Sequence, residues 1–69
     1  MTKITSQTVL DRESLRIARS AVRRRDRKAF AAQYALNRFC GNSPNLSVYW
    51  SLLDLGYRQA ADMVGRLYY

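Results

Sequence analysis

The sequence predicts an all-α protein, built as an antiparallel two-helix hairpin, from three observations. Apolar residues recur at alternating steps of three and four through the first half of the chain, as they do on one face of a helix. A turn signal, GNSP at residues 41–44, interrupts this pattern. A second amphipathic pattern with the helical period follows and continues almost to the last residue. Because 69 residues are enough for one hydrophobic core, we expect a single domain over residues 1–69.

The first predicted helix covers about residues 8–40. Thr8, with Asp11 three residues later, resembles a capping box at its start. A stripe with heptad spacing comprises Leu15, Ala18, Val22, Arg25, Ala29, Ala32, Leu36 and Phe39, and all of these are apolar except Arg25. The basic segment 23–28 contains neither Gly nor Pro, which favours one continuous helix. The alternative stays open: a break near Arg25 and Asp26, with Asp26 capping a new helix.

The turn at 41–43 and the second helix, about residues 44–67, follow from local signals. Gly41 suits the left-handed position after a helix end, and Ser43 with Pro44 suits an N-cap and first helical position. Four side chains of alternating sign recur every four residues: Asp54, Arg58, Asp62 and Arg66. Such a ladder aligns only on one helix, so we expect the helix to run through Gly56, with another backbone packed closely against that glycine.

A single hairpin leaves apolar side chains without a partner, which predicts a homodimer with a four-helix arrangement. Part of this surplus lies on the second helix, outside the face that meets the first, and part lies where the first helix extends past the second. The expected dimer interface comprises Leu10, Ile17, Val48, Leu52 and Leu55. Trp50 and Cys40 are expected to be buried. The tail Leu67-Tyr68-Tyr69 either frays or contributes to the dimer.

The residue inventory excludes several kinds of chemistry. The chain has no His, one Cys and five carboxylates, which are too few ligands for a metal cage and leave no His to activate a nucleophile. We therefore expect neither an enzyme nor a cofactor. A lone Cys gives no disulfide framework and indicates a reducing compartment. The first residues lack the apolar segment of a secretory signal, and no apolar run is long enough to span a membrane, so we expect a cytoplasmic protein.

The net charge of +7 is concentrated in the first half of the chain, because charges of opposite sign balance after Pro44. On a straight helix, several arginines and two aromatic residues share one face opposite the apolar stripe. The residues expected to bind a partner are Arg16, Arg19, Arg23, Arg27, Phe30 and Tyr34. Guanidinium groups bind carboxylates or phosphates, and aromatic rings supply anchoring area. A solvated helix face is the other interpretation, and nucleic acid is an alternative ligand.

Three segments follow one another along the chain: an arginine-rich segment, a turn and an aromatic segment. They are ESLRIARSAVRRRDRKAFAAQY, GNSP, and NLSVYWSLLDLGYRQAADMVGRLYY. In these it resembles the quorum-sensing anti-activators of Mu-like Pseudomonas phages. The resemblance implies a small phage protein that acts in the bacterial host cytoplasm by binding and disabling host proteins. The implied targets are a LuxR-family, autoinducer-dependent transcription activator and the ATPase that assembles type IV pili. The alternative function is that of a small arginine-rich helical dimer that binds nucleic acid.

Overall fold

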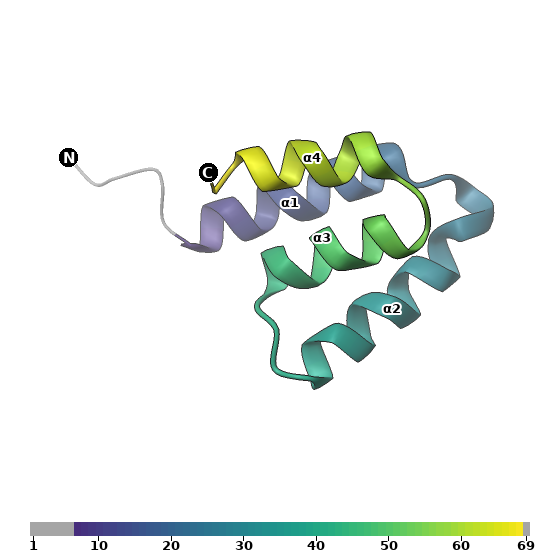
Figure 1. The fold of residues 1–69 in the computed structure, drawn as a ribbon, viewed down its shortest axis with the longest axis horizontal. Helices are drawn as coiled ribbons and strands as arrows, with labels where there is room; N and C mark the ends of the chain where they lie inside the picture. Colours follow the sequence, from purple (N-terminus) through teal and green to yellow (C-terminus); the bar gives the residue numbers. More distant parts are fainter. Residues whose placement is uncertain (1–6, 69) are drawn as a thin grey trace.

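Four α-helices and a short 3-10 helix build the computed structural model of the chain, which describes residues 7–68 (Figure 1). The all-α class is therefore confirmed, whereas the simple two-helix hairpin is wrong. Each of the two predicted helices is divided in two, and the four resulting helices pack together. The elements in chain order are α1 (Gln7–Ala21), η1 (Arg24–Asp26), α2 (Arg27–Phe39), α3 (Pro44–Asp54) and α4 (Arg58–Arg66).

The first helix breaks at Arg23, where the backbone is extended with φ −67° and ψ 151°. A contact from far along the chain stabilises this break. The backbone N–H of Arg23 donates to the hydroxyl oxygen of Tyr57 over 3.1 Å, and the same hydroxyl donates to the carboxylate of Asp26. Asp26 then precedes the first residue of α2. The continuous helix is thus wrong. The alternative break is correct in position, with Asp26 directly before the new helix, but the Asp26 side chain makes no capping hydrogen bond to α2.

The second break follows from the backbone of Gly56, which has φ +89°, a value that disfavours side chains with a Cβ atom. The N–H of Gly56 bonds to the carbonyl of Leu53, and the N–H of Tyr57 bonds to that of Leu52. This pair of bonds is a Schellman motif, which ends a helix. A Cβ atom at Gly56 would meet nothing within 4 Å, so the expected close approach of another backbone is also wrong. Gly41, with φ +97°, ends α2 in the same way, as predicted.

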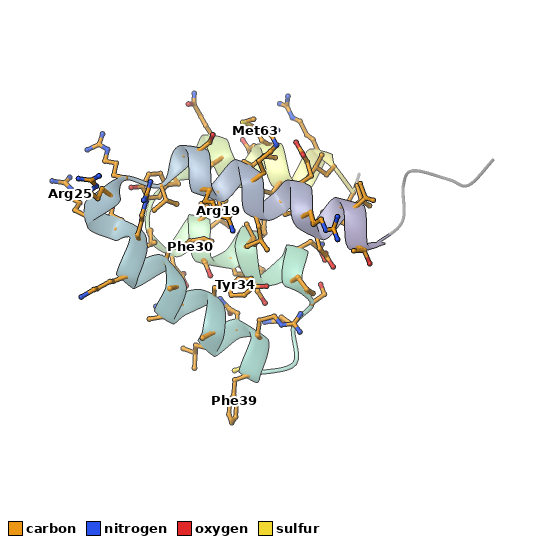
Figure 2. All side chains as sticks on the ribbon, turned by 180° about the vertical axis from the view of Figure 1, so that it is seen from behind. Arg19, Arg25, Phe30, Tyr34, Phe39 and Met63 are labelled. Carbon is orange, nitrogen blue, oxygen red and sulfur yellow. The ribbon has the colours of Figure 1, made fainter. Side chains whose placement is uncertain are left out.

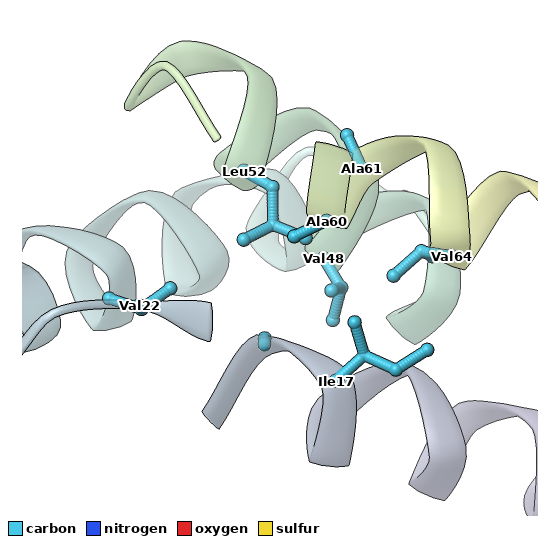
Figure 3. Packing of buried hydrophobic residues seen from close by; sticks show 8 residues of the cluster. Ile17, Val22, Val48, Leu52, Ala60, Ala61 and Val64 are labelled. Atoms are coloured by element: carbon cyan, nitrogen blue, oxygen red, sulfur yellow. The ribbon is translucent and has the colours of Figure 1, made fainter. Parts of the chain in front are cut away.

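The core lies where α1, α3 and α4 meet (Figure 3). Its buried apolar residues are Ile17, Ala18, Val22, Val48, Leu52, Ala60, Ala61 and Val64. Small residues on α4 allow this short helix to approach α1 and α3 closely. Three buried serines keep hydrogen-bond partners, including Ser51, whose hydroxyl lies 3.2 Å from the side-chain nitrogen of Asn37. In contrast, α2 contributes no buried residue, and of the α-helices it packs against α3 alone.

This core corrects the predicted dimer interface. Ile17, Val48 and Leu52 are buried inside one chain, because the two breaks fold α3 and α4 onto α1, and Leu10 and Leu55 are half-buried. The apolar surplus that predicted a homodimer is therefore largely covered within the monomer. The homodimer itself stays a prediction, as does a place for the half-buried Leu10 and Leu55 in its interface, whereas the buried Ile17, Val48 and Leu52 no longer support it.

Two predictions of burial are also wrong, and the C-terminal tail is partly placed. The Trp50 side chain is 45% exposed, and Cys40 is exposed at the end of α2. The hydroxyl of Tyr68 lies 3.2 Å from that of Ser14, so the tail packs against α1. The prediction for Tyr69 lies outside residues 7–68, which the structure describes.

Candidate functional site

A groove with a volume of about 610 Å³ lies between α1 and α2. These two helices diverge from the break at Arg23, and α3 lies beside them (Figure 1). The apolar lining of the groove comprises Leu15, Ala18, Val22, Phe30, Ala31 and Tyr34. Its polar lining comprises Arg16, Arg19, Ser20 and Arg27. Figure 2 shows Arg19 of α1 and Phe30 and Tyr34 of α2 in the region between the two helices.

The break in the first helix creates this groove from a face that the sequence pattern places on a straight rod. Because the chain bends at Arg23, the part of that face on α1 turns toward the part on α2. The two parts then form the sides of one groove. Of the six predicted partner-binding residues, the structure brings together Arg16, Arg19, Arg27, Phe30 and Tyr34. Arg23 alone is separated from them, because it forms the turn and its backbone binds Tyr57.

The two aromatic residues form one wall of the groove. The rings of Phe30 and Tyr34 stack with centroids 6.3 Å apart and an interplanar angle of 22°. Both side chains are half-buried and pack against the core. The sequence analysis placed both on the face opposite the apolar stripe, and the structure adds that they pack against the core and so hold α2 to the rest of the molecule. Half-buried aromatic residues beside a groove present a fixed apolar surface at low entropic cost.

The rim of the groove is strongly cationic. Arg16 forms an ion pair with Glu13, and the hydrogen bond from this guanidinium lowers the pKa of the Glu13 carboxyl group. Arg19 and Arg27 are exposed and have no ion pair among residues 7–68. Their guanidinium groups are thus available to carboxylates or phosphates of a partner, which they bind with planar, bidentate geometry.

The turn between α1 and α2, together with the first residues of α2, adds further positive charge. Its exposed basic residues are Arg23, Arg24, Arg25, Arg27 and Lys28. The one acidic residue in this turn, Asp26, accepts the hydroxyl of Tyr57. We call these five basic residues the arginine corner.

Sequence reasoning missed a second groove, of about 710 Å³, between α3 and α4. Its apolar lining includes Leu46, Val64, Tyr49 and Trp50, and the last two rings lie edge to face with centroids 5.3 Å apart. It contains one acidic and one basic residue, Asp62 and Arg66, and so has no strong preference for a charge. The pattern gave no signal for it, because its apolar residues also fit the apolar face of a continuous helix, and Asp62 and Arg66 fit the charge ladder of that helix.

The apolar stripe in the first half of the chain is buried in one part and exposed in the other. Its α1 part, with Ala18 and Val22, enters the core. Its α2 part remains exposed and comprises Ala29, Ala32, Leu36 and Phe39, of which Phe39 is 89% exposed. We call these four residues the outer α2 stripe. Heptad spacing could have identified it as a contact surface, although not as one that lies outside the monomer's core.

The fold and this site define a small all-α protein with a cationic, partly aromatic groove. Within residues 7–68, no group of His, Cys, Asp and Glu side chains is arranged to hold a metal ion. No helix in the same part of the chain has the length and apolar character needed to cross a membrane. Comparison with known protein families, curated proteins and solved structures finds no match.

Proposed function

We propose that the chain is a phage-encoded inhibitory protein that binds host proteins through the α1–α2 groove. The observation that carries this proposal is the combination of a half-buried aromatic pair with arginines around an apolar surface. Protein interfaces have this composition, with an apolar centre, a polar rim and an enrichment in aromatic residues and arginine. An inhibitor that acts by occupancy needs affinity and a stable fold, both of which a small helical protein can supply.

The proposed targets follow the resemblance of the sequence. The first is a LuxR-family transcription activator in the bacterial host cytoplasm, whose binding would prevent quorum-sensing activation. The second is the ATPase that assembles type IV pili. Both are much larger than this chain, so covering one functional surface of either would be enough to block it.

Nucleic-acid binding is the alternative function, and the arginine corner favours it. Five exposed basic residues in one turn would neutralise phosphates. The aromatic pair fits this function less well, because Phe30 and Tyr34 stack on each other and pack on the core, whereas base stacking needs an open ring face. Nucleic-acid binding would also lose affinity steeply with added salt, more so than a complex anchored by aromatic residues.

We further propose that the protein is a homodimer that pairs through the outer α2 stripe. Ala29, Ala32, Leu36 and Phe39 lie on a helix with no buried residue. Their spacing of three and four places them on one face, and the two alanines allow the backbones of two copies to approach. This interface leaves the α1–α2 groove open on each protomer, since the two surfaces share no residue.

The experiment that tests the proposed function measures how the protein affects DNA binding by a purified LuxR-family activator with its autoinducer. Fluorescence anisotropy of a labelled promoter fragment would report the inhibition. Arg19→Glu with Arg27→Glu should abolish inhibition, because the two arginines of the groove that have no ion pair within residues 7–68 are reversed in charge. Arg38→Glu with Arg58→Glu is the matched control, since these exposed arginines lie outside the groove and the net charge changes equally.

Two outcomes would contradict the proposal. Equal inhibition by both double variants would show that the groove does not bind the activator. Direct binding of this protein to the promoter fragment, measured without the activator, would support the nucleic-acid alternative instead. The same pair of variants applies to the pilus ATPase, with hydrolysis of ATP as the readout.

A further inference from the structure

We infer that the α1–α2 groove takes an acidic amphipathic α-helix of the partner protein, an inference that rests on the proposed function. The groove has three properties that decide the occupant: the kind of backbone in its walls, the apolar character of its centre, and the sign of charge on both of its sides. Each property removes a class of occupant.

The walls of the groove are helices, so they offer side chains and no free backbone edge. The backbone N–H and C=O groups along α1 and α2 are used within each helix. An extended peptide would therefore find no strand edge to pair with, and its own N–H and C=O groups would lose water over an apolar surface. A helix satisfies these groups internally, which makes it the fitting occupant.

The apolar centre requires an apolar stripe on that helix. Leu15, Val22 and Phe30 come from both walls and line the groove together with Tyr34. Burying this surface is favourable only against apolar side chains, at about 25 cal/mol per Å². A helix presents such a stripe through positions i, i+3, i+4 and i+7. Phosphate groups or sugars would leave the apolar side chains at the centre of the groove exposed to water.

The charges require acidic residues on both flanks of the stripe. Arg16 and Arg19 belong to α1, whereas Arg27 belongs to α2, so cations lie on both walls. The nearby Glu13 is already paired with Arg16. A basic helix would be repelled from both sides, and a neutral one would gain nothing from Arg19 and Arg27. Leucines flanked by glutamates are therefore the sequence type that fits.

The test uses a designed peptide as probe, measured by fluorescence anisotropy at physiological salt. The peptide has 15 residues, the length of α1, with leucines on one face, glutamates on both flanks and a hydrocarbon staple that locks the helix. One control peptide has the same composition in a scrambled order without the staple. A second control carries Lys in place of each Glu.

The stapled acidic peptide should bind, and Arg19→Glu with Arg27→Glu should weaken it by about tenfold or more. Arg38→Glu with Arg58→Glu should weaken it by less than about threefold, because these charges act only at long range. Ala31→Trp is a second variant that fills the groove without changing charge, and it should also weaken binding, which excludes a purely electrostatic effect. Circular dichroism of each variant verifies that the fold is intact.

Three results would overturn the inference: no binding of the stapled acidic peptide at millimolar concentration, equal binding of the scrambled peptide, or equal effects of the two arginine double variants. These results are distinguishable from failure of the proposed function. Suppose that Arg19→Glu with Arg27→Glu abolishes inhibition of the activator while the acidic helix does not bind. The inferred occupant is then wrong, whereas the proposal that the groove binds the activator holds. If the variant leaves inhibition unchanged, the proposed function fails as well.

Discussion

Replacing Tyr57 by Phe removes the hydroxyl group that joins the α3–α4 loop to the break in the first helix. This hydroxyl accepts the N–H of Arg23 and donates to the carboxylate of half-buried Asp26. A hydrogen bond to a charged group contributes about 1.5–3 kcal/mol, and one between neutral groups about 0.5–1.5 kcal/mol. Because Arg23 is exposed and water can replace its bond, we expect a loss of about 2 kcal/mol in the free energy of unfolding.

A loss of this size is easy to measure in so small a domain. It corresponds to a fall in Tm of roughly 10 °C, since 1 kcal/mol shifts a domain of this length by about 4–8 °C. Urea unfolding followed by circular dichroism gives the free energy directly. Tyr34→Phe is the matched control, because it removes the same atom from a tyrosine whose hydroxyl makes no hydrogen bond within residues 7–68.

A double-mutant cycle assigns the effect to the intended contact. Tyr57→Phe combined with Asp26→Ala should cost clearly less than the sum of the two single changes, because both remove the same hydrogen bond. The reasoning is refuted if Tyr57→Phe and Tyr34→Phe differ by less than about 0.5 kcal/mol, or if the two changes at Tyr57 and Asp26 are additive. In that case the break would have another cause.

Three further predictions concern the helix end, the tail and the dimer. Gly56→Ala should destabilise the fold by about 1–2 kcal/mol in urea unfolding, because φ is +89°; a gain in stability would contradict the Schellman end. Burial raises the pKa of the Tyr68 hydroxyl above its usual value of 10.0, so the folded state keeps this proton more tightly than the unfolded state does. Stability should therefore fall as pH rises above 10, and Tyr68→Phe should make this fall shallower; an unchanged slope would exclude the effect. Leu36→Glu with Phe39→Glu should convert a sedimenting dimer to monomer, and a monomeric wild-type protein would refute the proposed pairing.

The helical class and the turn at Gly41 could be predicted because their signals are local. The break at Arg23 could be given only as an alternative, because the group that stabilises it, the Tyr57 hydroxyl, lies 34 residues away. No residue near the break carries a helix-ending signal. Tertiary contacts of this kind override local propensity, which differs little among the residues of segment 23–28.

The break at Gly56 was predictable in principle, because glycine commonly ends helices. The charge ladder instead led to the prediction of a continuous helix through this residue. Each i,i+4 ion pair on a helix surface contributes about 0.2–0.5 kcal/mol. Turning the chain at Gly56 buries Val64 and Ala60 against the core, and one fully buried Val alone contributes about 1.5–3 kcal/mol. Burial of these side chains therefore outweighs the ion pairs and decides the fold, and the glycine supplies the backbone conformation that the turn requires.

The helix faces that line the candidate site could be predicted from the sequence. Arg16, Arg19, Phe30 and Tyr34 keep their positions on α1 and α2 because each half remains helical, so a face calculated for a straight rod still describes each half. What the pattern could not give was the concave shape, which depends on the angle at the break. Three of the five residues expected in the dimer interface, Ile17, Val48 and Leu52, were misassigned for the same reason, since they pack within their own chain.

The central claim is that the α1–α2 groove is the surface that binds the host protein. Heteronuclear NMR of the isotope-labelled chain, titrated with the unlabelled LuxR-family activator, tests it most directly. We expect amide signals along the groove to shift or broaden first, including those of Leu15, Arg19, Ala31 and Tyr34. Changes confined to the α3–α4 groove, around Trp50, would contradict the claim.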